Sequence, residues 1–315
     1  MGKKNQVYRR NSRQRRYGYG RRSPAVRNSI LIAAACVLVL ALAGGLIWYF
    51  LFYRTTLEQS NETSSIPKTL ESQIVTESSE NEPENTSAYA ALYPEMYVPK
   101  VEKVGAAVGE KSVYLTFNDA PSAQTDKLLE VLEQYDVEAT FFIYCNENSD
   151  AYLKNAIAKI HQKGHTVGVL TDTYDYQTIY ASVENYLQDF AKVFDLITEA
   201  TGEKPTVFRF AGGSVNGYNK AIIRELVQEM ERRGFTYHDW SLNSGDSEPG
   251  ATARQIYNTT VNGILSSGKS VVLMNNNSAA TLGQLPAIIE KVRENGYTFL
   301  ALQADTKPFT MALPE

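Results

Sequence analysis

From Ser112 onward, short β-rich runs alternate with amphipathic helical stretches, and this alternation limits the folds open to the chain. The seven β-rich runs are Val113–Phe117, Ala139–Tyr144, His165–Leu170, Thr206–Phe210, Phe235–Trp240, Ser270–Met274 and Tyr297–Leu302. Apolar residues between them recur at the spacing of a helix with one buried face, as at Leu285, Ile288 and Val292. Strands separated by helices pair in parallel, so the pattern predicts a (β/α) barrel or an open doubly wound sheet.

Polar residues and glycines gather where these predicted strands end. The five ends read Asn118-Asp119, Thr171-Asp172-Thr173-Tyr174, Ala211-Gly212-Gly213-Ser214, Asp239-Trp240 and Asn275-Asn276-Asn277. In both architectures the functional site lies at the carboxyl ends of the strands. No G-x-G-x-x-G motif follows the first predicted strand, so the sequence does not indicate a dinucleotide site.

A run of 26 uncharged residues lies between Arg27 and Arg54. As a helix it would be about 39 Å long, which exceeds the roughly 30 Å hydrocarbon core of a membrane. A cleaved signal peptide is the alternative, but its apolar region is shorter and ends in small residues, whereas this run ends in bulky residues such as Trp48. We therefore predict a basic tail over residues 1–28 and a transmembrane helix over residues 29–53.

Charge is distributed unevenly on the two sides of this helix. The first 27 residues hold ten Lys and Arg and no acidic residue, which predicts that the N-terminus stays in the cytoplasm. That leaves 21 of the 31 basic residues against all 35 acidic ones, a net charge of about −14 that argues against nucleic acid as a partner. We expect a single-pass protein of the cell membrane with an extracytoplasmic C-terminal domain.

Between the predicted helix and the alternating region, Glu, Ser, Thr and Asn dominate the composition, most clearly over Glu77–Asn85. Such a segment buries too little apolar surface to offset the entropy lost on ordering. We therefore predict a disordered extracytoplasmic linker over residues 54–99 and one folded domain over residues 100–315.

The motifs at the strand ends resemble, in order along the chain, those of the polysaccharide deacetylases, the NodB-homology family of carbohydrate esterases. The matching segments are Val113–Pro121, Ala139–Phe142, Gly164–Gly168, Phe208–Ser214, Tyr237–Trp240 and Val271–Met274. The resemblance covers roughly residues 112–308. It implies an α/β fold, a distorted (β/α) barrel of about seven parallel strands, and cell-wall glycan or peptidoglycan as the partner.

The resemblance also implies which positions carried the chemistry of the family. There, one Asp and two His hold a divalent metal such as zinc, a second Asp is the general base, an Arg positions that base, and a late His is the general acid. In this sequence the metal-binding carboxylate is kept as Asp119, while the two histidine positions hold Leu170 and Tyr174. The positions of the base, the arginine, the Asp-Trp aspartate and the acid hold Asn118, Arg209, Asp239 and Asn275.

These replacements predict that the reaction has been lost. One carboxylate does not make a zinc site, and an amide cannot take up a proton near neutral pH. We therefore expect no catalytic residue and no cofactor, with Asp119 either solvated or paired with Arg209. The candidates for a remaining substrate groove are Gly212, Gly213 and Trp240.

Three functions remain open from the sequence. The favoured one is a membrane-anchored, inactive module that binds cell-wall glycan or a protein partner that the sequence does not identify. The alternative is an active hydrolase of carbon–nitrogen bonds that de-N-acetylates peptidoglycan or chitin-like glycans through an altered metal site, built from Asp119, Asp172 and Asp175 with Tyr174. The third is a purely structural protein of the envelope.

Overall fold

The computed structural model describes residues 87–105, 110–145 and 150–314. The predicted basic tail, the predicted transmembrane helix and residues 54–86 of the predicted linker therefore lie outside the described residues. None of the described helices has the length and apolar character that a membrane-spanning segment needs.

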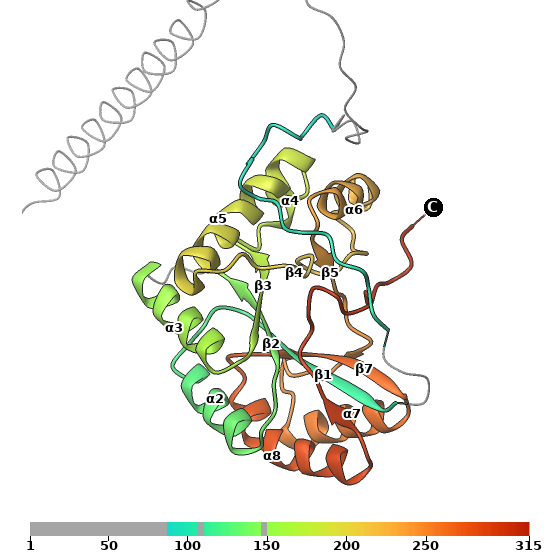
Figure 1. The fold of residues 1–315 in the computed structure, drawn as a ribbon. Coiled ribbons are helices and arrows are strands. Elements are labelled where there is room, and N and C mark those ends of the chain that lie inside the picture. The colour runs from blue at the N-terminus through green and yellow to red at the C-terminus, as the bar shows by residue number, and fades with distance from the viewer. Residues whose placement is uncertain (1–86, 106–109, 146–149, 315) are drawn as a thin grey trace, which may run out of the picture. The chain divides into compact units, whose positions relative to one another are not determined.

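One parallel sheet organises the described residues (Figure 1). Its strands are β1 (Ser112–Asn118), β2 (Thr140–Tyr144), β3 (Thr166–Thr171), β4 (Val207–Phe208), β5 (Thr236–Tyr237), β6 (Leu242–Asn243), β7 (Lys269–Asn275) and β8 (Thr298–Phe299). The order across the sheet is β5-β4-β3-β2-β1-β7-β6, and β8 pairs with the start of β1. All seven predicted strands are present, so the expected parallel α/β sheet is confirmed.

The sheet forms a half-barrel rather than a closed one. Strands β5 and β6 lie at opposite edges, and among the described residues no ladder joins them. They are nevertheless consecutive in sequence, because only residues 238–241 separate them. The chain thus crosses from one edge of the sheet to the other without a helix. Strand β6 was not among the strands predicted from the sequence.

Helices surround this sheet in Figure 1. They are α2 (Thr125–Gln134), α3 (Asp150–Gln162), α4 (Tyr176–Ile179), α5 (Val183–Thr201), α6 (Ile223–Arg232), α7 (Ala253–Leu265) and α8 (Ala279–Glu294). Helix α5 shows how the sequence sets its bounds: the Ser182 hydroxyl accepts a hydrogen bond from the Asn185 amide, and Gly202 ends the helix at a φ of 77°.

Side chains alternate between the two faces of the strands and fill two apolar clusters. On β3, Val169 belongs to the outer cluster between sheet and helices, whereas Leu170 belongs to the inner one. The buried members of the inner cluster are Tyr114, Phe142, Leu170, Val207, Val271 and Leu302. The inside of the half-barrel is therefore packed with apolar side chains.

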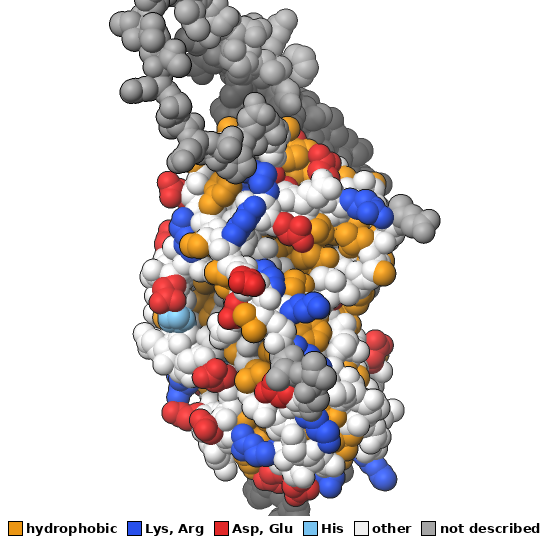
Figure 2. Space-filling model, turned by 45° about the vertical axis from the view of Figure 1, so that its right-hand side comes forward, with side chains coloured by type: hydrophobic (Ala, Val, Ile, Leu, Met, Phe, Trp, Pro, Cys, Tyr) orange, Lys and Arg blue, Asp and Glu red, His pale blue; other side chains and the backbone are white. Residues whose placement is uncertain are grey.

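Charged side chains are mixed on the surface. On the face drawn in Figure 2, Lys and Arg lie among Asp and Glu, with hydrophobic side chains between them. The described residues of this face form no continuous basic surface of the kind that binds nucleic acid.

The last part of the predicted linker is folded, which corrects the predicted boundary at residue 100. Met96 and Val98 are buried, and the Val98 amide donates to the Arg233 carbonyl. The composition of residues 54–99 did not predict this folded part, because a few apolar residues at the end of a polar stretch hardly change its average composition. Their partner Arg233 directly follows α6, more than a hundred residues further along the chain.

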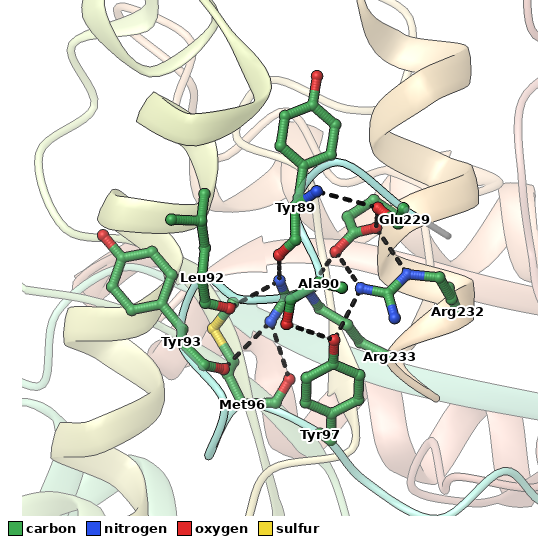
Figure 3. Close-up of polar contacts among 10 residues, drawn as sticks. Tyr89, Ala90, Leu92, Tyr93, Met96, Tyr97, Glu229, Arg232 and Arg233 are labelled. Atoms are coloured by element: carbon green, nitrogen blue, oxygen red, sulfur yellow. Dashed lines mark hydrogen bonds and ion pairs between the residues drawn. The ribbon is translucent and has the colours of Figure 1, made fainter. Parts of the chain in front are cut away.

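A fully buried arginine holds this segment in place (Figure 3). The Arg233 guanidinium donates to four backbone carbonyls of the segment, those of Tyr89, Leu92, Tyr93 and Met96. Its Nε donates to Glu229 Oε1 at 2.6 Å, and Glu229 also accepts from the Ser87 hydroxyl at 2.7 Å. Most donors of a buried cation are thus satisfied by the segment itself.

Two buried histidines accept hydrogen bonds from backbone amides. His165 Nδ1 accepts from the Ala139 amide at 3.3 Å, and His238 Nδ1 accepts from the Phe309 amide at 3.4 Å. Burial lowers the pKa of His165 to about 4, and burial together with nearby positive charge lowers that of His238 to about 3. Both imidazoles are therefore uncharged at neutral pH.

Removing the buried arginine should weaken the whole domain. In Arg233→Met the four carbonyls lose their donors and Glu229 loses one cation, so we expect the free energy of unfolding to fall by about 3 kcal/mol. Guanidinium denaturation measures the change. Arg232→Met is the matched control, because Arg232 also contacts Glu229 but is 23% exposed, and it should cost about 1 kcal/mol. Equal losses from the two variants would contradict a special role for Arg233.

His238 should make the domain sensitive to acid. The unfolded chain takes up a proton at this histidine below its ordinary pKa of about 6.5, whereas the folded chain does so only near pH 3. The contribution of His238 to the free energy of unfolding is therefore full above pH 6.5 and is lost as the pH falls toward 3. In His238→Gln, the stability lost between pH 7 and pH 5 in urea denaturation should shrink by about 2 kcal/mol. A variant that is equally destabilised at both pH values, with an unchanged difference between them, would refute this.

Candidate functional site

The strand ends are held together by Arg209, which follows β4. Its Nη1 donates to Thr116 Oγ1 at 3.0 Å and to Asn118 Oδ1 at 2.8 Å. Its Nε and Nη2 donate to the backbone carbonyls of His238 and Asp239 at 2.9 and 3.0 Å. Arg209 therefore connects β1 with the segment that follows β5, across the inside of the half-barrel.

The Arg209 side chain is fully buried between two aromatic rings. Its guanidinium carbon lies 4.3 Å from the centroid of the Phe142 ring and 5.6 Å from that of Trp240. Burial lowers the pKa of Arg209 to about 9, so the side chain still carries its charge at neutral pH. The rings and the four hydrogen bonds stabilise that cation in place of a carboxylate partner.

Asp119 is bound by the tyrosine at a former histidine position. Tyr174 Oη donates to Asp119 Oδ1 at 3.2 Å, and both residues have left-handed backbones, with φ values of 57° and 91°. Burial raises the pKa of Asp119, and the charge of Asp246 adds to this, while the bond from Tyr174 opposes it. Of the two states expected for Asp119, solvated or paired with Arg209, the pair is not formed among the described residues, where Arg209 binds Asn118 instead.

The former acid position is occupied by an amide that a second carboxylate holds. Asn275 donates to Asp246 from its side-chain Nδ2 at 2.6 Å and from its backbone amide at 2.9 Å. Thr281 Oγ1 donates to the same carboxylate at 2.6 Å. Asp246 was missed in the sequence because it follows β6, a two-residue strand with no periodic signal.

Asp239, the aspartate of the Asp-Trp segment, is bound by the loop after β4 and by the C-terminal segment. Its carboxylate accepts from the Ser214 amide at 2.8 Å, from the Ser214 hydroxyl at 2.5 Å and from the Met311 amide at 2.9 Å. Asp239 is buried, so these three bonds satisfy a charge removed from water. Its role here is to fasten the loop after β4 to the C-terminal segment.

The structure does bring the three predicted groove residues together. Gly212 and Gly213 have φ values of 77° and 86°. A Cβ on Gly213 would lie 3.1 Å from Trp240 Cη2, and one on Gly212 would lie 3.4 Å from Tyr176 Cζ. The two glycines thus let Trp240 and Tyr176 pack directly against the backbone of the loop, a position where a larger residue would be strained.

The alternative carboxylate site is not assembled. Asp172 pairs with Lys192 at 2.6 Å, and Asp175 accepts from the backbone amide of Thr178 at the start of α4. Within residues 87–105, 110–145 and 150–314, no three His, Cys, Asp or Glu side chains could hold a metal ion together.

The donor set at the family's metal position does not fit a divalent metal either. Leu170 is buried in the inner apolar cluster and offers no donor atom. Tyr174 keeps its proton at neutral pH, since burial and the charge of Asp119 raise its pKa. Of the three positions that the resemblance implies as metal ligands, Asp119 alone carries a donor suited to zinc, which is too few.

Comparison with known proteins gives a consistent result. The family model for polysaccharide deacetylase matches residues 105–237. A putative polysaccharide deacetylase of Bacillus subtilis is 30% identical over 207 residues, which is 64% of this chain and 70% of that protein. A peptidoglycan-N-acetylglucosamine deacetylase of Bacillus cereus is 28% identical over 201 residues, 62% of this chain and 71% of that protein.

Solved structures show the same likeness. The catalytic domain of a peptidoglycan N-acetylglucosamine deacetylase from Eubacterium rectale superposes with a TM-score of 0.64 at 32% identity. The match covers 69% of this chain and 98% of that domain, so the likeness extends well beyond the residues of the family model.

Proposed function

This chain belongs to the polysaccharide deacetylase family, and from that premise we propose that it is a membrane-anchored, extracytoplasmic member that binds cell-wall glycan without removing its acetyl groups. The observation that carries the proposal is the state of the positions where the family places reactive groups. Asn118 is bound to Arg209, Asn275 to Asp246, and Tyr174 to Asp119.

Hydrolysis of an acetamide needs a group that takes a proton from water and another that gives one to the leaving amine. The amides of Asn118 and Asn275 do neither near neutral pH. Of the two carboxylates beside them, Asp246 is bound by Asn275 and Thr281. Asp119 alone does not supply both proton transfers together with an activated water. These side chains can still hydrogen-bond the hydroxyl and acetamide groups of a sugar.

The proposed ligand is a glycan of N-acetylated amino sugars. Two of the relatives compared above carry peptidoglycan and N-acetylglucosamine in their names. This chain shares the sheet that brings the five strand ends to one edge, and its groove residues meet there. A binding site can persist on such a scaffold after the catalytic groups are lost, because binding and catalysis depend on different side chains.

We expect the full-length chain, purified in mild detergent, to release no acetate from acetylated chito-oligosaccharides or peptidoglycan above background. The reason is the joint loss of base, acid and two metal ligands. Released acetate is measured directly, with and without chelator. Activity that a chelator abolishes and zinc restores would overturn the proposal in favour of an active hydrolase.

A variant that carries histidine at both implied ligand positions tests whether the strand ends can still hold zinc. Leu170 lies inside the half-barrel and Tyr174 reaches Asp119, so Leu170→His with Tyr174→His should place two imidazoles beside that carboxylate. Calorimetry should then detect zinc binding that the unmodified chain lacks. A folded double variant that binds no zinc would mean that the strand ends no longer converge as in the family.

The anchor is proposed from the sequence. The uncharged run over residues 29–53 is long enough to cross a membrane, and the basic residues before it favour a cytoplasmic N-terminus. The acidic, apolar-poor stretch that follows would keep the domain away from the lipid surface and within reach of wall glycan.

Protease added to wall-stripped cells tests this topology. We expect the domain to be digested and an epitope tag placed before Arg27 to stay protected, because the positive flank holds the tail inside. Permeabilised cells serve as the control in which both parts are digested. A protected domain would refute the orientation, and a mature N-terminus near Arg54 would replace the anchor with secretion.

A further inference from the structure

We propose that the C-terminal segment 309–314 is a strap that closes the open side of the half-barrel and controls the groove by holding the loop after β4. This inference rests on the proposed glycan-binding function and adds how the site is regulated. We call residues 309–314 the strap and residues 211–219, which follow β4, the groove loop. In the closed state the strap is seated as in Figure 1, and in the open state the groove loop loses its support.

The first residue of the strap, Phe309, lies across the gap between the two edges of the sheet. Its amide donates to His238 Nδ1 and its carbonyl accepts from the Asp239 amide at 2.7 Å, both just after β5. Its ring centroid lies 5.5 Å from that of Tyr114 on β1 and 5.0 Å from the ammonium of Lys269 at the start of β7. Phe309 therefore connects the β5 edge with β1 and β7, where no ladder does so among the described residues.

One buried carboxylate joins the strap to the groove loop. Asp239 accepts from the Met311 amide on the strap, and from both the amide and the hydroxyl of Ser214 on the groove loop. The groove itself is close by, since a Cβ on Gly213 would lie 3.6 Å from Asp239 Oδ1. A buried carboxylate that loses a donor is destabilised, so release of the Met311 amide also weakens the hold on Ser214.

The groove loop depends on this hold, because most of its other hydrogen bonds are internal. The side-chain amides of Asn216 and Asn219 donate to carbonyls of the loop itself. They keep the shape of the loop but do not fix it to the sheet. Asp239 attaches the loop at Ser214, and the Tyr180 hydroxyl attaches it at its first residue. With the strap released, one of these two attachments is weakened.

The strap beyond Phe309 is the part of this arrangement that opens most easily. It belongs to no helix or strand, and its Thr310 and Ala312 are exposed. At its far end the Pro314 carbonyl accepts from Arg224 on α6. Segments that bury few apolar contacts open at a lower free energy than the core. A glycan that binds the closed form better than the open one therefore shifts the chain toward the closed form.

A proline at position 311 tests the strap, because it removes the N–H that donates to Asp239 and leaves the groove loop unchanged. In calorimetric titration of the full-length chain, we expect Met311→Pro to bind the hexamer of N-acetylglucosamine about tenfold more weakly. Ala312→Pro is the matched control and should bind as the unmodified chain does. It puts the same ring at an exposed position whose amide donates to no acceptor in the described part of the chain. Equal weakening by the two variants would refute the strap.

Hydrogen exchange of the unmodified chain measures the same coupling from the opposite direction. If the hexamer binds the closed form alone, about ten times its dissociation constant should slow exchange of the Phe309 amide about tenfold. The Val98 amide, which donates to the Arg233 carbonyl in the N-terminal segment, is the control and should exchange at an unchanged rate. In Met311→Pro without ligand, the Ser214 amide should exchange faster than in the unmodified chain.

The outcomes separate the strap from the proposed function. If the unmodified chain does not bind the hexamer, the glycan-binding function fails, and Ser214 exchange still decides whether the strap holds the groove loop. If the chain binds the hexamer but Met311→Pro binds it equally well, the strap is refuted while the function stands. If Met311→Pro does not fold, exchange of the Phe309 amide in the unmodified chain decides alone, and a rate that the hexamer leaves unchanged would refute the strap.

Discussion

The buried guanidinium of Arg209 is the group on which the arrangement of the strand ends depends. Its hydrogen bonds reach Thr116 and Asn118 on one side and the backbone after β5 on the other. Because β5 and β6 lie at the two edges of the sheet, these bonds join parts of a half-barrel that no ladder closes within the described residues. A buried cation is tolerated only while its donors are satisfied, so the same requirement fixes the end of β1 relative to the segment after β5.

Around this cation, the side chains at the positions that the resemblance singles out are engaged in hydrogen bonds. The Asn118 oxygen accepts from Arg209, the Asn275 amide donates to Asp246, and the Tyr174 hydroxyl donates to Asp119. Each partner is polar and at least partly removed from water, and an apolar substitute would have left it unsatisfied. These hydrogen bonds therefore stabilise the strand ends at the candidate site.

Both terminal segments of the domain contribute to this stability. The first described residues are held on α6 by Arg233, whose guanidinium binds four of their carbonyls. Near the C-terminus, the Met311 amide donates to Asp239, which also holds Ser214 in the loop after β4. The loop after β4 is thus connected to a segment more than ninety residues away, which helps to explain how this loop is kept in position.

The sequence by itself determined the parallel α/β architecture, and it predicted a site at the strand ends with amides at the positions where the resemblance implies proton-transfer groups. These depend on periodicity and on residue identity, which are local properties of the chain. The tertiary structure decided that Asp246 contacts Asn275, that Asp119 is bound by Tyr174, and that residues 87–98 belong to the folded domain. It also placed Phe309 beside Tyr114. Each of these facts joins segments far apart in the chain, and such contacts are set by how the helices and strands pack, which no local pattern records.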